Sequence, residues 1–267
     1  ERLAASVRLG AHGRRRPGMG EEFWHYRPAH PGDSARVIDW RRSARSDAHF
    51  VREREWQAAQ SVTLWLDTGR AMEFASADRP AKGRRARLLA LALAVLLTEA
   101  GERVALAGAR AVPAGTGRGQ IARLAEALSR PAADAEREAP ALGAAPRHGR
   151  AVFVGDFLGD PAALDSALSA ASARSVRGAL MQVLDPAEER FSYAGRVVFE
   201  SMAGTARHET LSAGDLAGRY AARLADRKAA LARMAGAAGW RFGGHHTGES
   251  AAPALLWLTR ALEPAGR

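Results

Sequence analysis

The chain has 267 residues, of which 47% are hydrophobic, so it can form one large α/β domain with a modest addition. It contains no cysteine, which excludes disulfides and thiolate metal sites. The formal net charge is +10, but no dense basic run is interleaved with aromatic residues; we therefore expect at most weak binding to polyanions and no specific nucleic-acid recognition.

The first part of the chain predicts a structured N-terminal arm over residues 1–56. Residues 1–20 are rich in Arg and Gly, so we expect a loop or frayed segment there. Residues 21–56 combine turn-forming Pro and Gly with many aromatic and charged side chains. This composition favours a folded lead-in that packs on a domain over residues 57–267.

A central strand is predicted at residues 61–66, where Val62, Leu64 and Leu66 alternate with Thr63 and Trp65. The strand ends at Asp67 and is followed by a loop of small residues. A strand that ends in this way, before a long helix, is typical of a parallel α/β sheet. Ligands of such sheets bind at the carboxyl edge.

The remaining elements alternate between helix and strand. We expect one helix at residues 81–99 and another at 250–262; three further helices should begin after the loop 114–120, at Asp160-Pro161, and at a capping box formed by Ser212 and Asp215. We expect strands at 103–109, 112–113, 151–157, 176–184 and 240–242. Weak alternation with turn signals near 188–211 predicts a small antiparallel insertion at the sheet edge. The fold class is thus α/β: a doubly wound, mainly parallel sheet with helices on both faces.

An ordered string of motifs resembles the bacterial family of domains of unknown function number 58, and the likeness covers nearly the whole chain. The motifs are Glu22-Phe23-x-x-Tyr26-Arg27, Pro31-Gly32-Asp33, Arg36-x-Ile38-Asp39-Trp40, Ser43-Ala44-Arg45, the Arg-Glu run at 52–55, Asp67, Gly101-Glu102-Arg103-Val104 and Asp156. The resemblance implies a von Willebrand factor type A-like fold.

The usual site of that fold binds Mg²⁺ or Mn²⁺ through Asp-x-Ser-x-Ser, a Thr from a neighbouring loop and a later Asp. By resemblance these would be Asp67, Thr116 and Asp156, but Gly69 and Ala71 stand at the two serine positions. Because two oxygen ligands are missing, we expect a degenerate site with no cofactor and at most weak Mg²⁺ or Mn²⁺ binding.

Two hypotheses concern what replaces the cation at this loop edge, Thr68 to Ala71. Arg70 could supply a tethered guanidinium that neutralises Asp67 and Asp156. Alternatively, Arg70 points into solvent and the acids cap loop amides, since exposed ion pairs are weak. The sequence leaves both open.

A second candidate surface lies in the lead-in, where charged residues surround tryptophans. Its docking candidates are Asp33, Asp39, Trp40, Arg41 and Arg45. Trp and Arg often carry binding hot spots, which favours a docking face. A solvated surface held by salt bridges is the alternative, because charge runs usually have that role.

These features favour a non-catalytic protein-interaction or adaptor module. The resemblance implies a MoxR-type AAA+ ATPase as partner, acting with this chain in chaperone-like maturation of an unknown client. The alternatives are a metal-dependent hydrolase or phosphatase using Asp67 and Asp156, and a nonspecific polyanion binder. The longest apolar run, Leu88 to Leu97, is too short to cross a bilayer, and we expect a cytoplasmic protein with no membrane span.

Overall fold

The computed structural model describes residues 2–5, 14–18, 22–30, 34, 38–44, 49–58, 60–76, 79–131 and 134–263. The chain divides into two compact units, one formed by Glu1–Ala11 with Ser61–Arg267 and the other by His12–Gln60. The first helix, α1 (Arg2–Ala5), belongs to the larger unit, where Ala4 joins the hydrophobic core. That the arm packs on the domain stays a prediction.

The smaller unit contains a three-stranded antiparallel sheet in the order β1-β3-β2. Its elements are β1 (Arg14–Gly18), β2 (Glu22–Pro28), α2 (Trp40–Ser43) and β3 (Phe50–Ala58). The prediction of a loop over residues 1–20 is wrong at Arg2–Ala5, which form α1, and at Arg14–Gly18, which form β1. Pairing of β1 with the long strand β3 satisfies the backbone groups that a loop would leave to water.

The larger unit is built on a six-stranded sheet in the order β11-β8-β7-β4-β5-β6. Its strands are β4 (Ser61–Leu66), β5 (Arg103–Leu106), β6 (Val112–Gly115), β7 (Arg150–Gly155), β8 (Arg177–Leu184) and β11 (Arg241–His246). All neighbouring pairs are parallel except β5 and β6, which form an antiparallel pair at one edge. The doubly wound, mainly parallel sheet is confirmed.

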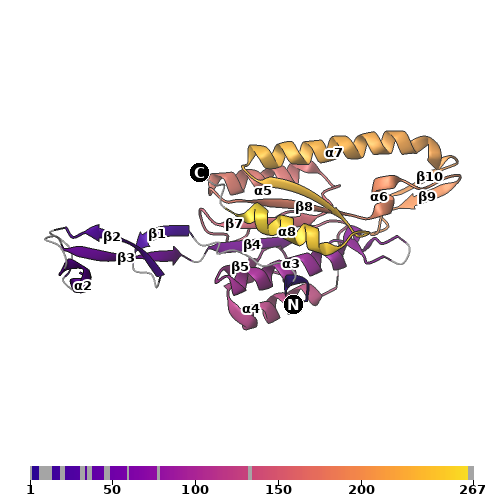
Figure 1. Cartoon of the computed structure of the whole chain (residues 1–267). Helices are drawn as coiled ribbons and strands as arrows, with labels where there is room; N and C mark the ends of the chain where they lie inside the picture. The colour runs from indigo at the N-terminus through magenta and orange to yellow at the C-terminus, as the bar shows by residue number, and fades with distance from the viewer. Residues whose placement is uncertain are drawn as a thin grey trace. The chain divides into compact units, whose positions relative to one another are not determined.

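Helices cover both faces of this sheet (Figure 1). The covering helices are α3 (Lys82–Glu99), α4 (Gly117–Ser129), α5 (Pro161–Ala173), α7 (Ala217–Ala237) and α8 (Ala251–Leu262). The short helix α6 (Pro186–Arg190) lies beside the hairpin of β9 (Val197–Glu200) and β10 (Arg207–Thr210), and single 3-10 turns form at η2 (Arg70–Glu73) and η3 (Ala213–Leu216). In the part of the chain that the structure describes, no helix is both long and apolar enough to cross a lipid bilayer.

Alternation along the strands assigns side chains to two separate cores. In β4, Val62, Leu64 and Leu66 pack with α3, α4 and α8, whereas Trp65 joins the opposite core. Phe153 of β7 also lies in that second core, 5.6 Å from Trp65 between ring centroids, under α5 and α7. Because both faces are buried, the strands read as nearly continuous apolar runs.

The antiparallel insertion forms a hairpin of β9 (Val197–Glu200) and β10 (Arg207–Thr210). Its position agrees with the insertion expected near 188–211. The capping box predicted at Ser212 is wrong: Ser212 precedes η3, its side chain makes no capping hydrogen bond, and α7 begins only at Ala217. The motif from Ser212 to Asp215 lies about one turn before the start of α7, because the 3-10 turn η3 separates Ser212 from that helix.

We predict that Gly178→Ala destabilises the larger unit by about 3 kcal/mol. A Cβ at Gly178 in β8 would lie 1.9 Å from the carbonyl oxygen of Ala151 in β7, so the two central strands would have to separate. Urea unfolding measures the loss. The matched control is Gly236→Ala in α7, where a Cβ has open space, and it should be neutral or stabilising by up to about 1 kcal/mol. Equal stability of the two variants would contradict the strand register.

Candidate functional site

Three neighbouring strands end in a buried aspartate at the carboxyl edge of the sheet. Asp67 follows β4, Asp156 follows β7 and Asp185 follows β8. The backbone N–H of Asp67 donates to the carbonyl of Val154 at 2.9 Å, which sets the first two strand ends side by side. The structure therefore brings Asp67 and Asp156 together, as the sequence predicted.

Asp156 is fully buried and its carboxylate is saturated with donors. Lys82 Nζ donates to Oδ2 at 3.0 Å, and Oδ1 accepts from Arg137 Nε at 3.2 Å and from the Leu158 backbone N–H at 3.0 Å. Burial acts to raise the pKa of Asp156, but the charges of Lys82 and Arg137 outweigh burial and hold this pKa below its usual value. Asp156 is thus a permanent carboxylate with two fixed cations.

Lys82, the first residue of α3, is only 1% exposed and links two elements. Its ammonium lies 3.0 Å from Asp156 and 2.6 Å from Oε1 of Glu188 in α6. Burial acts to lower the pKa of Lys82, but the two carboxylates raise it, so the side chain stays charged. One ammonium therefore stands between two carboxylates, in the role that a bound cation would have.

Asp67 has a different environment from its neighbour. Its Oδ1 accepts hydrogen bonds from the backbone N–H of Gly69 at 2.8 Å and of Glu138 at 2.9 Å. Burial raises the pKa of Asp67 to about 6, the charge of Asp156 adds to that effect, and the two backbone donors oppose it. Asp67 thus acts as a cap for loop amides.

A second segment, residues 134–138, lies directly over the loop that follows β4. The backbone N–H groups of Arg70 and Ala71 donate to the carbonyls of residues 135 and 136, both at 2.9 Å, and Thr68 Oγ1 donates to Glu138 Oε2 at 2.6 Å. A Cβ at Gly69 would lie 2.5 Å from Cα of Arg137. The expected serine is absent because backbone fills its space.

The proposed role of Arg70 is wrong. Its guanidinium pairs with Asp134 at 2.9 Å in an exposed contact, and Lys82 and Arg137 occupy the positions around Asp156. Arg70 begins η2, which faces segment 134–138 and turns the side chain away from the buried acids. The alternative, in which Asp67 caps loop amides, agrees with the structure.

The assignment of Thr116 to the Asp67 site is also wrong. Thr116 follows β6, which runs antiparallel, with Gly115 opposite Val104 and Val104 opposite Val62. Thr116 therefore lies level with the start of β4, whereas Asp67 follows its end. The loop that actually reaches Asp67 is 134–138, to which the sequence analysis assigned no role.

Lys82 is the residue that sequence analysis missed, although a signal was available. It is one of only two lysines, the other being Lys228. It also begins a helix, where a cation opposes the helix dipole, so a partner carboxylate is expected. Lys228 likewise pairs with Glu189, so both lysines hold α6.

The docking candidates of the lead-in lie in the smaller unit. Asp33 and Arg45 fall outside the described residues. Trp40 and Arg41 are exposed, and the Trp40 ring lies 5.5 Å from that of His49. Asp39 bonds through its backbone N–H to the carbonyl of Phe50 at 2.8 Å. A docking role for this surface stays a prediction.

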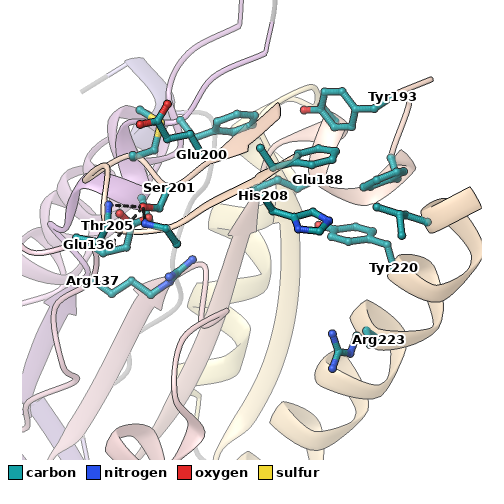
Figure 2. A pocket seen from close by; sticks show the side chains of 18 of the residues that line it. Glu136, Arg137, Glu188, Tyr193, Glu200, Ser201, Thr205, His208, Tyr220 and Arg223 are labelled. Carbon is teal, nitrogen blue, oxygen red and sulfur yellow. Dashed lines mark hydrogen bonds between the residues drawn. The ribbon is translucent and has the colours of Figure 1, made fainter. Parts of the chain in front are cut away.

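The donor set at the sheet edge does not fit a divalent cation. Both oxygens of Asp156 bond to fixed cationic side chains, and Gly69 and Ala71 offer no hydroxyl. Over the described ranges, no cluster of three or more His, Asp or Glu has a geometry that could hold a metal ion. Instead, a cavity of about 890 Å³ opens between this edge and the β9–β10 hairpin (Figure 2).

We predict that Lys82→Met lowers stability by about 3 to 5 kcal/mol at pH 7.5, because it leaves the buried Asp156 and Glu188 without their shared cation. The loss should be smaller at pH 5, because removal of the ammonium raises the pKa of both carboxyls and lets the variant take up protons there. Urea unfolding at both pH values measures it. Arg87→Met is the control, since Arg87 meets Glu73 at 3.4 Å in a partly exposed pair worth about 0 to 1 kcal/mol. Equal losses in the two variants would contradict a central role for Lys82.

We also predict that Asp67→Asn is more stable than the wild type at pH 7.5, by about 1 to 3 kcal/mol. In the folded chain the pKa is raised to about 6, and the unfolded value is near 4, so the folded state binds more protons between these values. The stability of the wild type should thus rise as pH falls through this window, and the difference should vanish near pH 4. Thermal unfolding across pH tests this. Asp226→Asn, an exposed change on α7, is the control and should alter stability by no more than about 0.5 kcal/mol.

No curated protein matches the sequence significantly. An aerotolerance-related membrane protein from Bacteroides fragilis NCTC 9343, with multiple mutations to serines, is 13% identical with a TM-score of 0.43, over 76% of this chain and 98% of that one. The conserved hypothetical protein BatB from Bacteroides thetaiotaomicron is 12% identical with a TM-score of 0.38, over 76% and 98%.

An uncharacterized membrane spanning protein from Vibrio fischeri is 15% identical with a TM-score of 0.22, over 78% of this chain and 99% of that one. The profile of the family described as "Protein of unknown function DUF58" matches residues 25–230. That range includes the central strand, Lys82, Asp67 and Asp156, the hairpin and the first two thirds of α7. The chain therefore belongs to the family of proteins of unknown function DUF58.

Proposed function

We propose that this chain is a non-catalytic protein-interaction module that presents the carboxyl edge of its sheet to a partner without a bound cation. The observation that carries the proposal is the buried ion-pair group in which Lys82 Nζ bonds to Asp156 at 3.0 Å and Glu188 at 2.6 Å. Because Lys82 and Arg137 neutralise the carboxylates at this edge, the edge needs no bound cation. The loops above it can therefore serve as a surface that contacts a partner protein.

The contact surface would be the loop after β4 with the segment that covers it. Arg70, Glu73 and Asp134 are exposed there and carry both signs of charge. The backbone bonds between Arg70, Ala71 and segment 134–138 hold these side chains on a fixed frame. Rigid, charged edges of this kind favour specific recognition over raw affinity.

An enzymatic role for Asp67 and Asp156 receives less support from the geometry. Asp156 has no oxygen without a donor, and its pKa lies below the usual value, so it is a poor general base. Oδ1 of Asp67 already accepts hydrogen bonds from two backbone N–H groups. A hydrolase would need at least one of these groups to be available to a substrate or metal.

The family to which the chain belongs is described as one of unknown function, so it assigns no activity. The resemblance in sequence to proteins that accompany MoxR-type AAA+ ATPases suggests the partner. In this proposal the chain is an adaptor that delivers an unknown client to such an ATPase. Mechanistically the module binds and positions; it transfers no group. The energy for remodelling would come from the ATPase.

We predict that affinity capture from the source organism recovers an AAA+ ATPase whose yield depends on ATP. Arg70→Glu with Glu73→Arg should lower this yield about tenfold, because both side chains are exposed on η2. Arg118→Glu, near the opposite edge of the sheet, places a larger charge change away from the proposed surface; it is the control and should have no effect.

Asp67→Asn should retain capture, since the proposed contact needs no cation at this aspartate. Loss of capture in this variant alone, or a micromolar dissociation constant for Mg²⁺ or Mn²⁺ in calorimetric titration of the wild type, would contradict the proposal. Turnover of a generic phosphoester that depends on Asp67 would favour the hydrolase instead.

A further inference from the structure

A large cavity of about 890 Å³ lies between the carboxyl edge of the sheet, the β9–β10 hairpin and the start of α7 (Figure 2). Lys82, Arg137 and Glu188 form the part of its wall next to the sheet edge. Ala71, Phe74 and Glu136 line it on the side of the proposed contact surface, and most of the remaining wall comes from residues 187–208 and α7, which that surface does not include. A cavity of this size is within the usual range for a ligand or peptide site.

One wall of the cavity is aromatic. The ring centroid of Phe191 lies 5.4 Å from Tyr193, 5.7 Å from Phe199 and 4.8 Å from Tyr220. Phe191 has φ 41° and ψ 61°, a left-handed conformation that a bulky side chain adopts only when the surrounding structure holds it there. Phe191 directs its ring into this cluster, so the surrounding structure holds the aromatic wall in one arrangement.

The wall that α7 contributes to the cavity is basic. Arg219 and Arg223 are one helical turn apart and exposed, and within the described ranges neither has a hydrogen bond or ion pair. The next turn differs: Arg227 donates through Nε to the carbonyl of Phe157 at 2.7 Å and through Nη2 to that of Gly159. Of the three arginines spaced four residues apart at 219, 223 and 227, the two that line the cavity are thus the ones whose guanidinium groups are free to bind a ligand. Figure 2 shows Arg137 and Arg223 extending toward the cavity from opposite sides.

The rim of the cavity carries an exposed apolar side chain. Met202, in the loop between β9 and β10, lines the cavity and is 42% exposed. Val198 of β9 and Leu211 after β10 are also exposed, but neither lines the cavity, and Val198 alternates along its strand with Phe199, which does. An exposed apolar side chain beside unpaired arginines is typical of an interaction site.

The charges of the cavity favour a protein segment over a nucleic acid. Glu136 and Glu200 lie on the side opposite α7, and Glu136 accepts a hydrogen bond from the backbone N–H of Ala203 at 2.7 Å. Carboxylates there would repel a phosphate backbone, whereas a peptide offers N–H donors to that side and carboxylates to the arginines.

We propose that this cavity binds an acidic segment of a partner protein in which a large apolar side chain is flanked by Asp or Glu. The apolar side chain packs on the aromatic wall of Phe191 and Tyr220, and the flanking carboxylates pair with Arg219 and Arg223. This inference rests on the proposed function, because it names the chemistry of the partner that the module recognises.

The test uses the full chain and dye-labelled synthetic peptides in fluorescence anisotropy. The probes are GDEFDEG, GDELDEG and GDEWDEG, with GNQFNQG lacking the charges and GDESDEG lacking the apolar anchor. At least one of the first three should bind about tenfold more tightly than both controls, and its affinity should fall with added salt. Absence of binding at millimolar peptide, or equal binding of the control peptides, would overturn the proposal.

Variants locate the site. Arg219→Glu with Arg223→Glu should weaken binding of the best peptide at least tenfold, and Tyr220→Ala should also weaken it. Arg233→Glu is the control, since it lies exposed on α7 and does not line the cavity. Circular dichroism melts confirm folding, and the exposed arginine variants keep the test valid if Tyr220→Ala unfolds. Unchanged binding in the double arginine variant, or displacement of the peptide by a DNA duplex of about 20 base pairs, would also overturn it.

The two proposals fail separately. If the wild type captures the ATPase and the double arginine variant captures it equally, while no peptide binds, the cavity proposal is wrong and the proposed function stands. If peptides bind through Arg219 and Arg223 but the wild type captures no ATPase, the cavity proposal stands for another partner and the proposed ATPase role is wrong.

Discussion

The structure of the carboxyl edge depends on one buried ammonium group. Lys82 Nζ lies between Asp156 and Glu188, and it permits a buried and a partly buried carboxylate to lie close together at this point. Burying charge is unfavourable, so a group of this kind contributes less to net stability than to specificity of arrangement. Removing the ammonium would leave Glu188 without its cation and Asp156 with Arg137 alone, which is why the arrangement is well determined.

The same group positions the elements around the cavity. Glu188 also belongs to the capping box of α6, where its Oε2 accepts from the backbone N–H of Asp185 at 2.8 Å. A five-residue helix is too short to be stable alone, so these contacts hold α6 in place. Phe191 follows directly at the C-cap. The ion pairs at the sheet edge are thereby linked to the aromatic wall of the cavity.

Local patterns explain why most elements were predictable. Alternation in β4, the Asp160 cap of α5 and the left-handed Gly101 after α3 depend on a few neighbouring residues. The acids at strand ends were also predictable, because parallel strands end at the same edge of a sheet. Thr116 failed for the opposite reason: whether its strand runs parallel or antiparallel is a property of the sheet, and β6 is antiparallel.

The sequence by itself determined the α/β class, the two-faced core, the family and the pair Asp67 and Asp156 at one edge. Only the tertiary structure decided which cation meets Asp156, since Lys82 and Arg137 reach it across 74 and 19 positions of the chain. It also decided that residues 134–138 fill the space at Gly69. Contacts over such separations depend on how loops close on the sheet, and no local pattern of residues specifies that.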